Sequence, residues 1–317
     1  MNTLPGQGAS LVFGASGFIG RWVVRELLLR GNHVTAVVRD PGRGEDAFAG
    51  WSRVPELHRA DLAHAGEGSA VIAALRPAVV YNLAGYGVDR TERGESLAER
   101  INHHLVAELA VACAAGPSGA GPRFVHVGSA LEYGVAGGIL SESTAPQPTT
   151  LYGRTKLAGT REVTAAALAH GTRGVTARLF TVFGDGEHPG RLFPSLINAA
   201  QRRSDIPLTD GRQRRDFAWA GDVAGLLVDL AGAPYESGEV VNVACGRMHS
   251  VADFARECAA QLGMPAERLR FGALPGRPEE MDHDGVDITR LRALTGRAAN
   301  ANLGAAIALA LGTPLGS

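Results

Sequence analysis

Residues 11–20 read Leu-Val-Phe-Gly-Ala-Ser-Gly-Phe-Ile-Gly, a short apolar run that leads into three glycines spaced three apart. The run predicts a buried strand, and the apolar periodicity of Phe18–Arg30 predicts a helix directly after it. In such a turn one glycine permits the tight bend, one lets the backbone approach a pyrophosphate, and one lets the helix pack on the strand. The helix N-terminus adds unpaired N–H groups and a positive dipole end. Gly14, Gly17 and Gly20 therefore predict a dinucleotide-binding loop.

Strand-like and helix-like segments alternate through the first half of the chain. The strand-like runs are almost continuously apolar, as expected for strands buried on both faces. This alternation predicts an α/β fold with a doubly wound parallel sheet of the Rossmann type. The expected strands are Leu11–Phe13, His33–Val38, Val79–Leu83, Phe124–Val127 and Val175–Leu179, and the expected helices are Phe18–Arg30, Ser96–Ala115 and Tyr152–His170.

The regular alternation ends near residue 180. Beyond it, short helical patterns alternate with Gly/Pro loops and isolated strands, which is typical of a smaller α+β lobe. We expect residues 1–180 to form the dinucleotide-binding domain and 181–317 to form the substrate lobe, with segments near 215–245 returning to the main domain. The helical patterns of this half are Leu192–Gln201, Val223–Ala231 and Val251–Leu262.

The composition excludes several classes of function. Hydrophobic residues make up 45% of the 317 residues, which suits an ordinary globular core. The formal net charge is −1, so neither nucleic acid nor an anionic membrane is an expected partner. Apolar stretches such as Leu303–Leu311 are too short to span a bilayer, and residues 1–8 lack the pattern of a signal peptide. We therefore expect a cytoplasmic globular protein.

The three cysteines, Cys113, Cys245 and Cys258, lie far apart in the sequence. They have no metal-ligand spacing, and an odd number of distant cysteines does not form a disulfide framework. The sequence therefore predicts free thiols and no metal site.

The end of the second strand bears on the choice of cofactor. An acidic residue there hydrogen-bonds the adenosine ribose of NAD, whereas an arginine suits the 2′-phosphate of NADP. This chain has Val38 followed by Arg39, with Asp40 one place later. The pattern favours NADP (NADPH) and leaves NAD possible. Asp61-Leu62, just past the third strand, is a candidate contact for the adenine ring, although an aspartate in a turn explains Asp61 almost as well.

Tyr152 and Lys156 lie one helical turn apart at the start of a predicted helix, so their side chains share one face. A tyrosine with a pKa of about 10 is a poor acid–base group at neutral pH. A neighbouring ammonium group stabilises tyrosinate and brings that pKa towards the working range. Ser129 ends a predicted strand upstream and would place its hydroxyl at the same point. These three residues predict redox chemistry on a carbonyl or an alcohol.

Several motifs together resemble the extended short-chain dehydrogenases/reductases, the NAD-dependent epimerase/dehydratase family. The resemblance covers nearly the whole chain. The motifs that carry it are Gly14-Ala-Ser-Gly-Phe-Ile-Gly20, Asp61-Leu62, Asn82-Leu-Ala-Gly85, Gly128-Ser-Ala-Leu-Glu-Tyr-Gly134, Tyr152-Gly-Arg-Thr-Lys156, Arg178-Leu-Phe-Thr-Val-Phe-Gly184, Arg214-Arg-Asp-Phe-Ala-Trp-Ala-Gly-Asp-Val223 and Val241-Asn-Val-Ala-Cys-Gly246.

This resemblance implies a nucleotide-diphosphate sugar as substrate and a homodimer formed through the helices at Ser96–Ala115 and Tyr152–His170. It implies Ser129, Tyr152 and Lys156 as the catalytic trio. The cofactor-binding candidates are Gly14, Ser16, Gly17, Phe18, Ile19, Gly20, Arg39, Asp61, Leu62, Leu83, Ala84, Gly85, Asn102, Tyr152 and Lys156. The substrate-binding candidates are Ser129, Ala130, Tyr152, Thr181, Arg191, Arg215 and Arg277, of which Arg215 and Arg277 match arginines that reach the diphosphate.

The residues after Ser129 narrow the reaction. The family's 4,6-dehydratases carry an Asp-Glu pair there, but this chain has Ala130-Leu131, which can neither remove nor donate a proton. The stretch Gly128–Gly134 is instead similar to the Gly-Ser-Ser-Glu-Glu-Tyr-Gly of GDP-4-keto-6-deoxymannose reductases, and Arg277-Pro-Glu-Glu is similar to their Arg-Pro-x-Glu. We therefore expect NADPH-dependent reduction of a nucleotide-diphosphate 4-keto-6-deoxyhexose. An NAD-dependent 4-epimerase remains the alternative, because it needs the same trio.

One position departs from the family pattern. Thr181 stands where the family usually has an asparagine that contacts the substrate, so the bound sugar or its orientation differs from the common case. A non-catalytic NADP-binding sensor on the same fold is a third hypothesis. It is the weakest, because such proteins typically lose the tyrosine or the lysine, and this chain keeps both.

Overall fold

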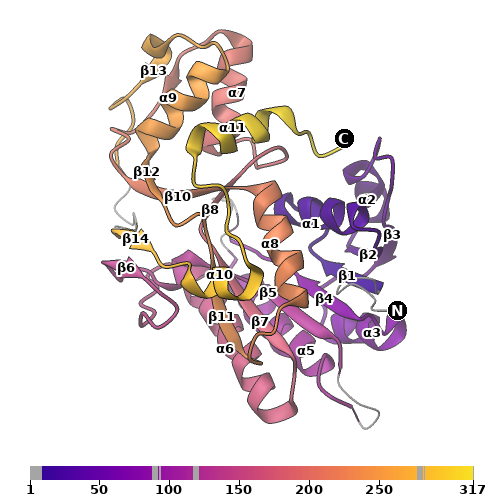
Figure 1. Cartoon of the computed structure of the whole chain (residues 1–317). Helices are drawn as coiled ribbons and strands as arrows, with labels where there is room; N and C mark the ends of the chain where they lie inside the picture. The colour runs from indigo at the N-terminus through magenta and orange to yellow at the C-terminus, as the bar shows by residue number, and fades with distance from the viewer. Residues whose placement is uncertain are drawn as a thin grey trace.

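The computed structural model describes residues 9–87, 92, 94–116, 121–276, 281 and 283–316. Its centre is a seven-stranded sheet with the order β11-β7-β5-β4-β1-β2-β3, in which every neighbouring pair is parallel (Figure 1). This confirms the expected doubly wound α/β fold. The strands are β1 (Ala9–Phe13), β2 (His33–Val38), β3 (Glu56–Arg59), β4 (Val79–Asn82), β5 (Arg123–Ser129), β7 (Gly174–Leu179) and β11 (Glu239–Val243).

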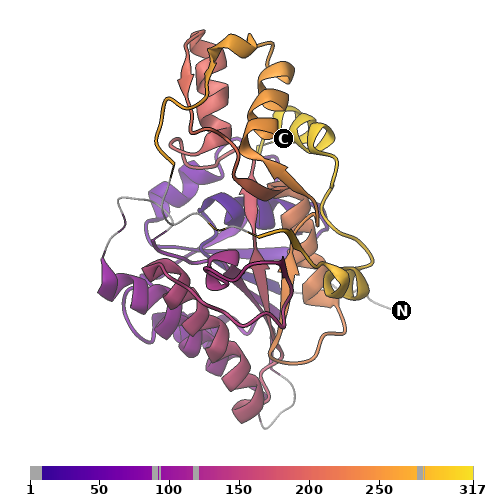
Figure 2. The same ribbon diagram turned by 90° about the vertical axis from the view of Figure 1, so that its left-hand side faces the viewer.

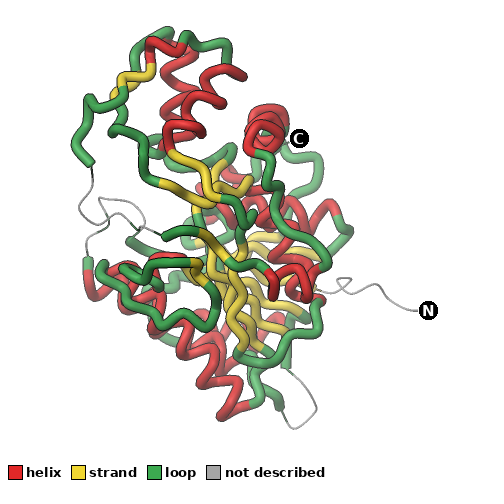
Figure 3. Tube along the Cα trace, turned by 60° about the vertical axis from the view of Figure 1, so that its left-hand side comes forward, coloured by secondary structure: helices red, strands yellow, loops and turns green. Residues whose placement is uncertain are grey.

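Helices cover both faces of this sheet (Figure 3). On one face α3 (Glu67–Leu75), α5 (Leu105–Ala112) and α6 (Leu151–His170) bury a core that includes Phe13 and Phe124. On the other face α1 (Phe18–Leu29), α8 (Ala220–Gly232) and α10 (Thr289–Thr295) bury the larger core around Trp22. Because successive side chains of a strand point to opposite faces, strands covered on both sides are mostly apolar. β1 therefore ends in the buried hydrophobic run Leu11–Phe13, whereas β7 carries Thr176 and Arg178 among its apolar residues.

A second unit lies beyond the sheet and is built from α7 (Leu192–Arg202), α9 (Val251–Gln261) and α11 (Leu303–Gly312). These helices enclose an aromatic core in which the rings of Phe217 and Phe254 stack at 4.3 Å. Figures 1 and 2 both place this unit above the sheet. The chain enters it directly after β7, so it begins at the edge where the parallel strands end. Ligands of open α/β sheets bind at this edge.

Short strands form three smaller sheets outside the main one. β8 (Thr181–Phe183), β10 (Arg214–Trp219) and β12 (Met248–Ser250) form a three-stranded sheet, and two-stranded sheets pair β9 (Ile206–Pro207) with β13 (Leu269–Arg270) and β6 (Ile139–Leu140) with β14 (Gly285–Val286). Of the segment 215–245, β11 joins the main sheet and α8 packs on α1, whereas β10 pairs only with β8 and β12. The domain boundary near residue 180 stays a prediction.

The predicted helix at 96–115 differs from the observed one. The structure has α4 (Glu95–Glu99), a π-helical turn η1 (Arg100–His104) and α5, which ends at Ala112. Apolar periodicity does not reveal a π turn, because the extra residue per turn only shifts the apolar face. Such turns are frequent at functional sites, and this one carries the buried Asn102. The remaining helix, α2 (Pro41–Ala47), has Asp40 as its N-cap, and the Asp40 carboxylate accepts from Gly42 N at 3.0 Å.

The cysteines Cys113, Cys245 and Cys258 are buried and free. Burial raises the pKa of Cys113 and Cys258 to about 12, which keeps these thiols protonated and unreactive. Among the described helices, none has both the length and the apolar composition to cross a membrane.

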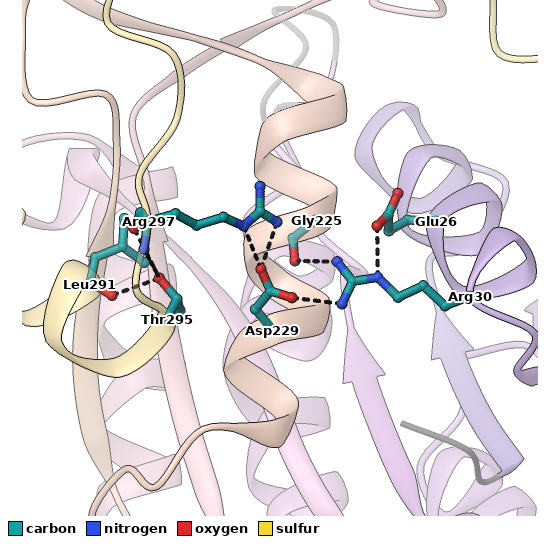
Figure 4. A network of polar contacts seen from close by, with 7 residues as sticks. All are labelled: Glu26, Arg30, Gly225, Asp229, Leu291, Thr295 and Arg297. Atoms are coloured by element: carbon teal, nitrogen blue, oxygen red, sulfur yellow. Dashed lines mark hydrogen bonds and ion pairs between the residues drawn. The ribbon is translucent and has the colours of Figure 1, made fainter. Parts of the chain in front are cut away.

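Charged side chains join the glycine-loop helix α1 to α8 and to Arg297, which follows α10 (Figure 4). Arg30 at the end of α1 donates to Asp229 of α8 at 2.6 Å, to Glu26 at 2.7 Å and to the Gly225 carbonyl oxygen at 3.3 Å. Asp229 also accepts from Arg297, beyond α10, at 2.6 Å. One carboxylate thus holds two arginines from separate elements.

We expect Asp229→Ala to lower the free energy of unfolding by about 1 kcal/mol, because both of its ion pairs are partly exposed to solvent. Urea unfolding followed by circular dichroism measures the change. Asp210→Ala is the control, since Asp210 lies 3.8 Å from a largely exposed Arg212. Equal stability of Asp229→Ala and the unmodified protein would show that the network does not attach α1 to α8.

Candidate functional site

The glycine loop is shaped by close backbone contacts. Gly14 has φ +73°, a left-handed conformation that favours glycine, and a Cβ atom there would lie 2.6 Å from the Ala84 backbone nitrogen. A Cβ atom on Gly20 would lie 2.1 Å from the Gly14 carbonyl oxygen, so α1 packs directly on the loop. The N-cap of α1 is Gly17, which has no side chain to cap the helix. The N-terminus of α1 therefore fits the pyrophosphate of a dinucleotide.

The loop after β4 lies against the glycine loop. Its backbone is held by Asn82, whose side-chain oxygen accepts from Ala84 N at 3.2 Å and whose side-chain nitrogen contacts His126 Nδ1 at 3.2 Å. Leu83 and Ala84 approach Gly14 through their backbone atoms, and Gly85 is exposed beside them. The structure therefore brings the cofactor candidates 14–20 and 83–85 together.

Asn102 joins this loop to the helix that carries the tyrosine. Its side-chain oxygen accepts from Tyr86 N at 3.0 Å, and its side-chain nitrogen donates to Tyr86 O at 2.7 Å and to Thr155 Oγ1 at 2.9 Å. The side chain is completely buried. The π turn places this amide between two elements that come from distant parts of the sequence. Asn102 therefore positions the β4 loop relative to α6, and its contact with the cofactor stays a prediction.

Ser129, Tyr152 and Lys156 meet at the carboxyl end of β5. Ser129 is the last residue of β5, and Tyr152 and Lys156 lie in the first turns of α6, whose N-cap Thr150 accepts from Gly153 N at 3.0 Å. The Ser129 side chain lies close enough to the Tyr152 hydroxyl to act on its pKa as a hydrogen-bonding group. Burial, and next the charge of Glu132, raises the pKa of Tyr152, while Ser129 and the Arg191 charge act in the opposite direction. Tyr152 is therefore protonated at neutral pH in the absence of a ligand.

Lys156 is the only lysine of the chain. It is 2% exposed, and this burial lowers its pKa to about 8, with the Glu132 carboxylate opposing the shift. His126 lies near enough to feel the Lys156 charge, which adds to burial in holding the His126 pKa well below its usual value. A lysine whose pKa is near 8 can exchange a proton close to physiological pH.

The adenosine end of the site is more open. Arg39 is exposed at the end of β2, where a 2′-phosphate would lie, while Asp40 is occupied in capping α2. Asp61 lies two residues after β3, and its carboxylate accepts from Ala63 N at 3.1 Å, so it stabilises its own turn. Leu62 packs partly against the core of that face. This role in the turn is enough to explain an aspartate at position 61, and no contact with an adenine ring is needed.

The substrate candidates are spread over several elements. Ala130 is buried directly after Ser129, and Thr181 begins β8 and is half-buried. Arg191 precedes α7, and its charge lowers the pKa of Tyr152. Arg215 on β10 donates to the Met281 carbonyl oxygen at 3.0 Å. Arg277 lies outside the described residues.

Two buried glutamates belong to this region and were not among the expected site residues. Glu187 pairs with Arg191 at 3.2 Å, and burial raises its pKa to about 7. Its Oε2 atom is buried and has no partner among the described residues. Glu132 is completely buried and contacts Arg178 at 2.8 Å. Local patterns exist for both, since Arg191 follows Glu187 by four residues and Ser129-x-x-Glu132 is a capping box, but the burial that makes these glutamates notable comes from the tertiary structure.

A cluster on the outer side of η1 could hold a cation, although the sequence predicted no metal site. Glu99, His103 and His104 each offer a ligand atom, and these atoms lie within 4.8 Å of one another. Both ring nitrogens of His103 already face carboxylates, those of Glu99 and Glu162, at 3.1 Å. The contacts of His103 with Glu99 and Glu162 account for the position of its ring without a bound cation.

The fold, the glycine loop and the uncapped helix N-terminus define a dinucleotide-binding protein of the Rossmann class. The chain belongs to the NAD dependent epimerase/dehydratase family, whose model matches residues 10–244. An uncharacterized UDP-glucose epimerase of Bacillus subtilis is 31% identical over 260 residues, covering 76% of this chain and 78% of that protein. The dTDP-6-deoxy-L-talose 4-dehydrogenase (NAD(P)(+)) of Kitasatospora kifunensis is 29% identical over 309 residues, covering 92% and 90%.

A solved structure is similar over almost the full length. MoeE5 in complex with UDP-glucuronic acid and NAD superposes with a TM-score of 0.80 at 28% sequence identity, covering 97% of this chain and 98% of that chain. The similarity includes the second unit as well as the seven-stranded sheet. The family assignment made from the motifs is therefore confirmed.

Proposed function

We propose that this protein reduces the 4-keto group of a nucleotide-diphosphate 4-keto-6-deoxyhexose with NADPH. The observation that carries the proposal is the protonated Tyr152, which interacts with Ser129 and lies one helical turn from the buried Lys156. Next to this trio stand Ala130 and Leu131, which offer no acid or base for a dehydration. The site therefore has a proton donor for a carbonyl reduction, and positions 130 and 131 lack the acid–base pair of a dehydratase.

In this mechanism NADPH, when bound, supplies a hydride to carbon 4 of the sugar. Ser129 donates a hydrogen bond to the 4-keto oxygen and polarises the carbonyl. Tyr152 then protonates the oxygen as negative charge develops on it. The Lys156 ammonium stabilises the tyrosinate that remains, and its pKa of about 8 lets it pass a proton to Tyr152 for the next turnover.

The relatives support this class of substrate and also favour a second candidate. One of them is named for oxidation at carbon 4 of a dTDP-6-deoxyhexose, the reverse of the proposed step. Another is named as a UDP-glucose epimerase, and the similar solved structure contains NAD. A 4-epimerase would use Tyr152 first as base and then as acid, and it would keep its NAD bound between the two half-reactions.

The test is to measure NADPH and NADH oxidation at 340 nm with a panel of GDP-, dTDP-, UDP- and CDP-4-keto-6-deoxyhexoses. We expect stoichiometric consumption of NADPH with at least one of them. A purified protein that retains nicotinamide and interconverts 4-epimers without net consumption is an epimerase. NADP binding without turnover on any sugar nucleotide indicates a sensor.

Arg39 is the basis for preferring NADPH. We expect Arg39→Asp to shift the ratio of kcat/KM for NADPH over NADH towards NADH by about tenfold or more, because the variant replaces a phosphate partner by a ribose hydroxyl partner. Steady-state kinetics with both coenzymes measures the ratio. Arg53→Asp makes the same charge change at an exposed loop position and serves as the control. An unchanged ratio in Arg39→Asp would make Arg39 incidental to coenzyme choice.

We also propose a homodimer formed through α5 and α6. Two large apolar side chains on these helices are exposed in the single chain, Val111 at 50% and Leu168 at 84%. Exposed apolar residues on neighbouring helices favour an interface. Light scattering coupled to size-exclusion chromatography should give twice the chain mass of 33.0 kDa, and a mass of one chain would reject the dimer.

A further inference from the structure

A completely buried carboxylate, that of Glu132, lies against the backbone of Ser129. Glu132 accepts three hydrogen bonds, from Ser129 N at 2.8 Å, from Thr160 Oγ1 at 3.0 Å and from Arg178 Nε at 2.8 Å. These donors come from the end of β5, from α6 and from β7. A single carboxylate thus connects the strand that carries Ser129 with the helix that carries Tyr152 and Lys156.

The same residue shapes the turn that holds Ser129. Ser129 is the N-cap of the short helix η2 (Ala130–Glu132), its hydroxyl accepts from Leu131 N at 3.2 Å, and Glu132 closes the capping box. Space around the carboxylate is tight, since a Cβ atom on Gly128 would lie 2.6 Å from Glu132 Oε1. Arg178 is fixed in turn, with its guanidinium 4.6 Å from the centre of the Tyr133 ring. These contacts therefore hold the Glu132 carboxylate in one position.

We propose that Glu132 is a positioning residue of the trio, which fixes Ser129 against α6 and places a buried negative charge close to Tyr152 and Lys156. This inference rests on the trio of the proposed function but not on the identity of the sugar. A negative charge in this place favours the acid form of the tyrosine, which a reductase needs at the start of its cycle.

Other charges also act on the two side chains. Tyr152 is subject to Arg191, which opposes Glu132, and to Glu92, which acts in the same direction as Glu132. Lys156 has His126 as a neighbour on β5, and that imidazole is uncharged because burial lowers its pKa. Burial lowers the Lys156 pKa and the Glu132 charge raises it. Removing the Glu132 charge therefore leaves burial unopposed, and the Lys156 pKa must fall.

The single lysine makes a direct measurement possible. Protein grown with lysine labelled with ¹³C at Cε gives one lysine signal, that of Lys156, whose pH titration reports its pKa without any substrate. The unmodified protein should titrate near pH 8. In Glu132→Gln, which keeps the size of the side chain, we expect the midpoint to fall by about one pH unit. A midpoint unchanged in Glu132→Gln would overturn the proposal.

Two controls separate charge from structure. Asp216→Asn neutralises another buried carboxylate, one that accepts from Cys245 N at 2.8 Å and Gly246 N at 2.7 Å, and should leave the Lys156 midpoint where it is. Glu132→Asp keeps the charge while disturbing the contacts, and its midpoint should stay closer to that of the unmodified protein. If the Lys156 midpoint fell equally in Asp216→Asn and Glu132→Gln, the change would come from a general loosening of the structure, and the proposal would be overturned.

Glu132→Gln leaves Arg178 without a buried partner, which can prevent folding. The double variant Glu132→Gln/Arg178→Met removes both charges and avoids a lone buried arginine. Its Lys156 midpoint should still fall below that of the unmodified protein, because Glu132 and not Arg178 acts directly on Lys156. An unchanged midpoint in the folded double variant would also count against the proposal.

A kinetic measurement links Glu132 to the reaction. If the panel identifies a ketone substrate, kcat for its reduction by Glu132→Gln should decline at lower pH than in the unmodified protein, because Tyr152 and Lys156 lose their protons earlier. A decline at the same pH would contradict the proposal. If no ketone is reduced, the proposed function fails, while the lysine titration still decides the role of Glu132.

Discussion

Tyr152→Phe is expected to lower kcat for ketone reduction by roughly 10³-fold, about 4 kcal/mol of transition-state stabilisation. The variant removes the hydroxyl that interacts with Ser129 and that protonates the sugar oxygen in the proposed mechanism. Single-turnover reduction by NADPH gives the rate, and the quenching of protein fluorescence by NADPH gives the dissociation constant. Because the glycine loop holds the cofactor, that constant should change by less than about threefold, since the hydroxyl adds at most one hydrogen bond to binding.

The matched control for this variant is Tyr235→Phe. Tyr235 donates to the Arg173 carbonyl oxygen at 3.0 Å, so the change removes a hydrogen-bonded tyrosine hydroxyl from another part of the protein. Tyr235→Phe should keep normal turnover. Substantial turnover by Tyr152→Phe would reject Tyr152 as the general acid, whatever happens in the control.

Gly20→Ala should have the second largest effect. The added methyl group would lie 2.1 Å from the Gly14 carbonyl oxygen and 2.9 Å from Ala15 backbone atoms, which cannot rotate away as a side chain can. Moving the loop or α1 to relieve such overlap costs about 1–3 kcal/mol. If the same movement weakens the pyrophosphate contacts equally, the affinity for NADPH falls by about tenfold or more.

Isothermal titration with NADPH, together with urea unfolding, measures both consequences of Gly20→Ala. Gly312→Ala in α11 is the control, because a Cβ atom at Gly312 meets nothing within 4 Å and the change should be neutral or slightly stabilising. Unchanged NADPH affinity in Gly20→Ala would show that the close contact between α1 and the loop is not required for the dinucleotide.

Local patterns predicted the strands β1, β2, β4, β5 and β7 of the main sheet, while the catalytic role of the trio stays a prediction. The glycine loop, the apolar run of β1 and the i, i+4 spacing of Tyr152 and Lys156 are properties of short segments, so they can be read from neighbouring residues. We expected these features to lie close together because parallel strands end at one edge of the sheet. The helix α2 (Pro41–Ala47) was missed, since its two glycines and its proline indicate a turn, although Asp40 followed by Pro41 is a helix-start signal.

Features that depend on tertiary contacts could not be predicted. The pair Glu132–Arg178 joins residues 46 positions apart and has no sequence signature. Asn102 was expected at the site, but its contacts depend on a π turn that periodicity does not reveal. The two-residue strands β6, β9, β13 and β14 are too short to carry an alternating pattern. Each of these requires the fold before it can be recognised.

The most direct test of the proposed reaction uses NADPH carrying deuterium at C4 of the nicotinamide and a 4-keto-6-deoxyhexose nucleotide that the enzyme accepts. A ketoreductase transfers one deuterium to carbon 4 of the sugar and releases one NADP⁺ for each product, and we predict this result by mass spectrometry and proton NMR. Inversion at carbon 4 of a nucleotide sugar with tightly held NAD, and with no net oxidation of NADPH, would contradict the assignment as a reductase.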